Sequence, residues 1–133
     1  MKITAADKYF SLCVRNAADN TCEWCGKSDA RMECSHVYSR RHRTIRWDAM
    51  NAVCKCNGCH KKWHESPLNA FTWFESKFGI GRIDLLREKM NMKVKVSKIE
   101  EKEIAKHYRE QLKEIEAKRA KGEIGHIEFI SYQ

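Results

Sequence analysis

The chain has 133 residues, seven of them cysteines, and carries a formal net charge of +8. This length predicts one domain with a modest apolar core, and no segment approaches the ~20 apolar residues of a membrane span. No apolar signal peptide is visible either, so we expect a cytoplasmic protein whose cysteines hold metal rather than an exported disulfide scaffold.

The first predicted element is a helix over residues 4–18. Thr4 and Asp7 have the spacing of a capping box, with Asp in place of the usual Glu. Apolar side chains cover two neighbouring sides of this helix, which predicts that it packs on the core. Cys13 has no paired cysteine nearby, so we expect it to be a small buried hydrophobe rather than a ligand.

Two Cys-x-x-Cys knuckles, Cys22/Cys25 and Cys56/Cys59, enclose the central part of the chain. Between them we predict a strand over residues 31–38, a polar connector over residues 39–48 that stays outside the core, and a short strand over residues 51–54. A helix follows over residues 58–64 and ends at Ser66-Pro67.

Three further helices are predicted after this central part, over residues 68–78, 83–90 and 97–121. The last begins at Ser97, which forms a capping box with Glu100, and has only a narrow apolar seam. Such a helix can lie on the domain, pair with a second copy in a homodimer, or project into solvent. We therefore divide the chain into a domain over residues 1–92 and a helical extension over residues 93–133, whose end at residues 126–133 can add a strand.

The knuckles predict a structural zinc site. Zn²⁺ binds four tetrahedral ligands in such sites, and each Cys-x-x-Cys supplies two thiolates, so Cys22, Cys25, Cys56 and Cys59 complete one site. An alternative is that one pair is only a turn, with Cys34 or Cys54 as the substitute ligand.

His60 and His64 are four residues apart, which places them on one face of a helix where they can share a metal. His60 directly follows Cys59 and would be poorly placed to bind the same ion, which favours a second, catalytic divalent metal. The alternative is a finger-like site of Cys56, Cys59 and His64.

Positive charge is concentrated over residues 38–64, which have seven basic residues against one acidic residue, a net charge of +6. A solvated face is one explanation, but this density favours a polyanionic partner, nucleic acid. We expect DNA contacts from Arg40, Arg41, Arg43, Arg46, Lys61 and Lys62.

The residues His36, Asn51, His60 and His64, in this order and spacing, resemble the HNH, or ββα-metal, endonuclease family. The zinc-knuckle branch of that family has C-x-x-C before and C-x-x-C-H after, similar to TCEWC and CNGCH here. The segment SHVYSRRHRTIRWDAMNAV is similar to phage recombination nucleases of the NinG type. The resemblance covers residues 7–64, or as far as 90, and leaves the C-terminal extension unexplained.

The resemblance implies an α+β fold with a small zinc-stabilised ββα-metal core, and a phosphodiester hydrolase acting in a host cytoplasm if phage-encoded. It implies His36 as general base, Asn51 as an orienting residue, and His60 with His64 as ligands of Mg²⁺ or Mn²⁺, with Ni²⁺ or Zn²⁺ as alternatives. Ser35 stands where many members have an acidic or histidine ligand, so we name it a possible ligand. The alternatives are a non-catalytic zinc-knuckle nucleic-acid-binding module and a zinc-stabilised adaptor whose partner docks on the C-terminal helix.

Overall fold

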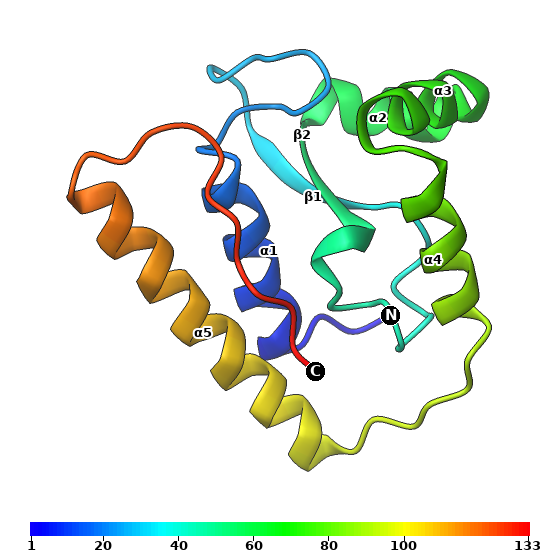
Figure 1. The fold of residues 1–133 in the computed structure, drawn as a ribbon, viewed down its shortest axis with the longest axis vertical. Helices are drawn as coiled ribbons and strands as arrows, with labels where there is room; N and C mark the ends of the chain where they lie inside the picture. Colours follow the sequence, from blue (N-terminus) through cyan, green and yellow to red (C-terminus); the bar gives the residue numbers. More distant parts are fainter.

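The computed structural model describes residues 1–133 and is built around a short β-hairpin (Figure 1). Strands β1 (Met32–His36) and β2 (Ala52–Cys56) pair antiparallel, with Met32 opposite Cys56 and His36 opposite Ala52. Five helices surround the hairpin: α1 (Ala5–Ala17), α2 (Asn57–Glu65), α3 (Pro67–Phe78), α4 (Ile80–Met90) and α5 (Lys98–Ala120). The prediction of an α+β chain with a long C-terminal helix is confirmed.

Local signals set most helix ends. The Thr4 hydroxyl accepts the Asp7 N–H at 3.3 Å, and the Asp7 carboxylate accepts the Thr4 N–H at 2.9 Å, so the predicted capping box at α1 is confirmed. The Ser97 hydroxyl caps α5 by accepting the Glu100 N–H at 3.1 Å. Helix α4 begins three residues before its predicted start, because Gly79 adopts a φ of +87° that turns the chain directly out of α3.

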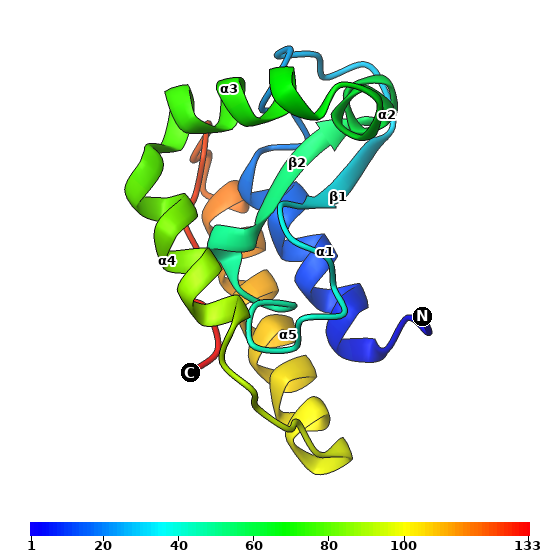
Figure 2. The same cartoon turned by 90° about the vertical axis from the view of Figure 1, so that its right-hand side faces the viewer.

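The hairpin separates two apolar clusters. Figures 1 and 2 show the corresponding helices, α1 with α5 on one side of the hairpin and α3 with α4 on the other. On one face, Cys54 and Met32 pack with Phe10 of α1 and Tyr108 of α5. On the other face, Val53 belongs to a smaller cluster with Ile45, Phe74, Ile83 and Leu86. All five residues of β2 are buried, so both faces of this strand are covered. Alternate residues of this strand therefore pack against different helices, Cys54 on the side of α1 and α5 and Val53 on the side of α3 and α4.

Helix α5 lies along α1, which is one of the three arrangements that the sequence left open (Figure 1). Its apolar seam is buried there, through Ile104, Tyr108 and Ile115. The predicted homodimer would therefore need a different face of this helix. The division into residues 1–92 and 93–133 stays a prediction.

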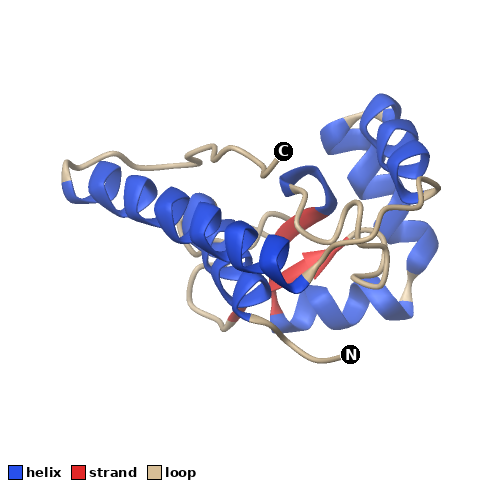
Figure 3. Ribbon diagram, turned by 90° about the horizontal axis from the view of Figure 1, so that it is seen from below, coloured by secondary structure: helices blue, strands red, loops and turns tan.

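The prediction of a strand at residues 126–133 is wrong. This segment runs back along α5 as an extended loop (Figure 3). Its polar groups bond to helix residues: the Ile127 N–H donates to the Ala17 carbonyl at 2.9 Å, and the Ile130 N–H donates to the Gln111 side chain at 2.9 Å. Because α1 and α5 supply these partners, the two backbone N–H groups are hydrogen-bonded although the segment joins no sheet.

The connector over residues 39–48 also differs from its prediction, because its second half is core. Ile45, Arg46, Trp47 and Asp48 are all buried. The charges are tolerated because they are paired: Arg46 with Asp7, and Asp48 with Lys89 at 3.0 Å. No helix has both the length and the apolar character needed to cross a membrane.

Candidate functional site

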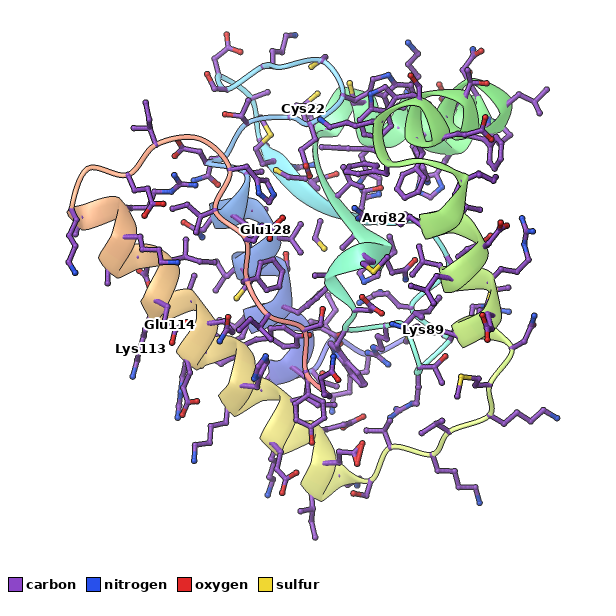
Figure 4. All side chains as sticks on the ribbon, in the orientation of Figure 1. Cys22, Arg82, Lys89, Lys113, Glu114 and Glu128 are labelled. Atoms are coloured by element: carbon purple, nitrogen blue, oxygen red, sulfur yellow. The ribbon has the colours of Figure 1, made fainter.

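The four knuckle cysteines meet at the end of the hairpin where α2 begins; Cys22 is labelled there in Figure 4. All four sulfur atoms lie within 4.8 Å of one another, and the Cys25 and Cys56 sulfurs are 3.8 Å apart. A tetrahedron with Zn–S bonds of ~2.3 Å has edges of ~3.8 Å. The cluster can therefore hold a structural metal such as zinc.

The backbone of each knuckle supports a thiolate. The Cys25 N–H lies 3.4 Å from the Cys22 sulfur, and the Cys59 N–H lies 3.4 Å from the Cys56 sulfur. Burial by itself would raise the pKa of Cys22, but hydrogen bonds from the backbone N–H groups of Cys25, Cys56 and Trp24 lower it to about 7. These fixed donors stabilise the charged form that binds metal.

The alternative ligands lie outside this cluster. Cys34 and Cys54 face each other across the hairpin, and burial raises the pKa of each to about 12. Neither His60 nor His64 joins the four sulfurs. The geometry therefore favours four thiolates over both alternatives, and all seven cysteines are free of disulfide bonds.

His36, His60 and His64 line one open pocket of about 790 Å³. Its walls come from α1, β1, α2 and the start of the connector. They carry the basic side chains Lys8, Arg15 and Arg40, and also Asp7 and Glu33, which are paired with other residues. The His60 and His64 rings lie 5.2 Å apart between centroids, as neighbours one helical turn apart do. The pocket thus combines three imidazoles with positive charge.

The surroundings of His36 define its tautomer. Its Nε2 lies 3.0 Å from the backbone carbonyl oxygen of Arg46. A carbonyl only accepts, so Nε2 carries the proton and the Nδ1 of the neutral ring is left as an acceptor. The ring also packs on Phe10, with centroids 5.9 Å apart, and burial lowers the pKa of His36 below its ordinary value of 6.5. His36 is therefore mainly neutral at neutral pH.

Glu33 is a site residue that the sequence did not reveal. Its carboxylate accepts a hydrogen bond from His60 Nδ1 at 2.8 Å and pairs with Arg31 at 2.7 Å. The hydrogen bond with His60 is the main reason that the pKa of Glu33 lies below its ordinary value. With Nδ1 protonated by this contact, His60 in its neutral form presents Nε2 for coordination. In the sequence, Glu33 looks like any charged residue on a strand.

Asn51 is fully buried and holds the connector between the strands. Its side-chain oxygen accepts the Tyr38 N–H at 2.8 Å, and its amide donates to the carbonyls of Tyr38 and Ile45 at 3.0 Å each. The Asn51 backbone carbonyl accepts the Val37 N–H at 2.9 Å. These bonds fix the backbone on both sides of the connector, directly after His36.

Two predicted site residues do not reach the pocket. Arg46 is 3% exposed, and its guanidinium is bound to the Asp7 carboxylate, so the prediction that it contacts DNA is wrong. Ser35 is 1% exposed and accepts a hydrogen bond from Lys55 at 3.2 Å, so the structure places this possible metal ligand outside the histidine pocket. The buried Lys55 ammonium holds the Ser35 hydroxyl inside the hairpin.

Lys55 belongs to the basic stretch in sequence but is also buried. Its ammonium lies 3.0 Å from the centre of the Trp63 ring, and burial lowers its pKa to about 7. Of the other predicted DNA contacts, Arg43 is paired with Glu101 at 2.7 Å, and Arg40 lines the pocket. Arg41, Lys61 and Lys62 are exposed. The accessible positive surface is therefore smaller than the sequence suggests.

No protein-family model, no curated protein and no solved structure matches this chain. The structure by itself defines an α+β chain with a four-cysteine cluster that can hold a structural metal such as zinc. The function of the histidine pocket has to be argued from its chemistry.

Proposed function

We propose that this chain is a metal-dependent DNA endonuclease of the HNH, or ββα-metal, type, with zinc in the four-cysteine cluster and a role in phage DNA recombination or processing. The observation that carries this proposal is that His36 of β1 and His60 and His64 of α2 line one open pocket together with Lys8, Arg15 and Arg40. A protein that only binds nucleic acid has no need for three imidazoles at that place.

In this proposal His36 is the general base. Nδ1 of its neutral ring takes a proton from a water whose oxygen attacks phosphorus, and the bond from phosphorus to the 3′-oxygen breaks. The hydrogen bond from Nε2 to the Arg46 carbonyl holds the ring in the required tautomer and steadies the imidazolium that forms. Asn51 acts as a positioning residue by fixing the backbone that follows His36.

His60 and His64 would hold the catalytic divalent ion, Mg²⁺ or Mn²⁺ with Ni²⁺ or Zn²⁺ as alternatives. Two imidazoles suit Ni²⁺ or Zn²⁺ by themselves, whereas Mg²⁺ or Mn²⁺ would take most of its ligands from water and phosphate oxygens. Glu33 orients the His60 ring in the way that outer carboxylates orient metal-binding histidines. The bound ion would supply electrostatic stabilisation of the negative charge that grows on the phosphate and the leaving oxygen. Arg15 and Arg40 on the pocket wall are placed to bind flanking phosphates.

The test is plasmid cleavage by the zinc-loaded protein with Mg²⁺, Mn²⁺ or Ni²⁺. We expect nicking or cutting that stops when the added metal is omitted and that His36→Ala abolishes, while DNA affinity measured without added metal stays within about twofold. His107→Ala is a matched control, because His107 lies on α5 away from the pocket and contacts the chain's own tail. Cleavage that survives His36→Ala would reject the assignment of the base.

One observation favours a second candidate, a zinc-knuckle module that binds nucleic acid without cutting it. The four cysteines are the only group of three or more potential ligands placed to share an ion. In a binding module the contact between Glu33 and His60 would be purely structural. Binding of DNA without cleavage under any of the three metals, together with no second bound ion per chain, would favour this candidate over the enzyme.

A further inference from the structure

A second, smaller pocket lies beside the histidine pocket. It has a volume of about 210 Å³, and its walls include Val37 and Tyr38 after β1, Trp63 of α2, and Phe71 and Phe74 of α3. No charged side chain lines it. Pockets for drug-sized ligands usually have ~300–1,000 Å³, so this volume suits a single flat ring system.

The two pockets share walls. Val37 and Trp63 line both of them, so a ligand can place a polar part among the imidazoles and an apolar part among the aromatic rings. The backbone of the shared wall is fixed, because Asn51 bonds to both Val37 and Tyr38. The pocket is therefore formed before any ligand arrives, which lowers the entropy cost of binding.

Phe71 shows that the aromatic surface is not needed for the core. Its side chain is 44% exposed and belongs to neither apolar cluster, although Phe74, three residues further along α3, is only 1% exposed. An exposed aromatic ring at the rim of an apolar pocket beside a basic one is the arrangement that proteins use to stack the bases of single-stranded nucleic acid.

We propose that this pocket receives one unpaired nucleobase of a DNA strand whose phosphate lies in the histidine pocket. The proposal rests on the endonuclease function and specifies its substrate as DNA with an unpaired base at the cleavage site. Duplex bases are stacked inside the helix and cannot enter, whereas an unpaired base can stack on Phe71, Tyr38 or Trp63. Stacking accepts any base, so the site reads strandedness rather than sequence.

The charges nearby select this occupant over an apolar peptide. The histidine pocket shares Val37 and Trp63 with this apolar one and is lined by Lys8, Arg15 and Arg40, and Arg41 follows on the chain. A nucleotide joins an anionic phosphate to an apolar ring, which matches the two adjoining pockets. An apolar peptide would use only the smaller one.

The test compares the zinc-loaded wild-type protein with Phe71→Ala at one fixed salt concentration, without chelator and without added Mg²⁺, Mn²⁺ or Ni²⁺, so that no cleavage occurs. The probes are a fluorescent 12-nucleotide oligothymidylate and a 12-unit abasic strand of equal charge. We expect the wild type to bind oligothymidylate more tightly than the abasic strand, and Phe71→Ala to weaken oligothymidylate binding by ~5- to 100-fold without changing abasic binding. Leu68→Ala is the matched control, because Leu68 is 84% exposed on the same helix and lines neither pocket.

Equal affinity of the wild type for the two probes, or equal effects of Phe71→Ala and Leu68→Ala, would overturn the proposal, and so would binding of an apolar peptide that oligothymidylate cannot displace. Because these measurements need no cleavage, they are independent of the plasmid assay. Preferential base binding without cleavage would leave the base pocket standing and remove the endonuclease. Cleavage without preferential binding of oligothymidylate would leave the endonuclease function standing and reject the base pocket.

Discussion

Arg46 offers the sharpest test of the structure, because sequence and structure give it different functions. Its Nε donates to Asp7 at 2.9 Å, a second guanidinium nitrogen reaches the same carboxylate and the Lys2 carbonyl at 3.2 Å, and Trp47 Nε1 donates to Asp7 at 3.0 Å. Both charges are buried. Removing one partner of a buried ion pair costs ~3–5 kcal/mol, because the other charge is left without compensation.

Arg46→Met keeps the apolar stem and removes the guanidinium. We expect a loss of ~3–5 kcal/mol in the free energy of unfolding, which corresponds to a melting temperature about 10–25 °C lower. Circular dichroism with excess zinc measures this change without a contribution from metal loss. Arg40→Met is the matched control: Arg40 lines the histidine pocket, so DNA affinity should fall while stability stays within ~0.5 kcal/mol.

The double variant Asp7→Asn/Arg46→Met should cost less than the sum of the two single changes, because it leaves no unpaired charge. A loss below ~1 kcal/mol for Arg46→Met, combined with weaker DNA binding, would refute the structural role and restore the sequence-based one.

The ion pair between Asp7 and Arg46 also predicts that the free energy of unfolding depends on pH in acid. Burial would raise the pKa of Asp7, but hydrogen bonds and charge from Arg46, with Thr4, hold the pKa below its ordinary value of 3.8. The folded chain therefore binds this proton less readily than the unfolded chain. The contribution of this ion pair to the free energy of unfolding is therefore complete at pH values above 3.8, the ordinary pKa. It is lost as the pH falls through the lower pKa that Asp7 has in the folded chain. In Arg46→Met the buried carboxyl has lost its main partner, so this loss on acidification should shrink or change sign.

Two further predictions concern the cluster and the connector. Cys59→Ser should lose tightly bound zinc and most of the melting transition, since metal binding in small zinc modules contributes ~10 kcal/mol or more of folding free energy. Cys34→Ser is the control and should keep the metal, because Cys34 lies outside the cluster. Equal zinc content in both variants, measured by mass spectrometry, would contradict the four-thiolate site. Asn51→Ala removes the three hydrogen bonds of this buried side chain and should lower the free energy of unfolding by ~2–4 kcal/mol, measured by thermal unfolding. Cleavage should be about 100-fold slower, because His36 is then misplaced. Unchanged stability would show that the connector keeps its conformation without this side chain.

Local chemistry is what the sequence by itself determined. The capping box at Thr4, the α5 cap at Ser97 and the neighbouring His60 and His64 rings involve residues within four positions of each other, so spacing alone predicts their contacts. The four-cysteine cluster was predictable for a related reason: one kind of ligand pair occurs twice, and a tetrahedral ion needs two pairs.

Only the tertiary structure decided which charges face solvent. Arg46 and Lys55 both lie in the basic stretch over residues 38–64, yet each is buried beside a partner on another element. Arg46 is paired with Asp7, and Lys55 contacts the Trp63 ring and Ser35. Glu33 met His60 only when the hairpin and α2 came together. The free energy of a buried charge depends on partners brought near by folding. Unlike the cysteine pairs, these charged residues have no repeated spacing that marks which distant residue is the partner.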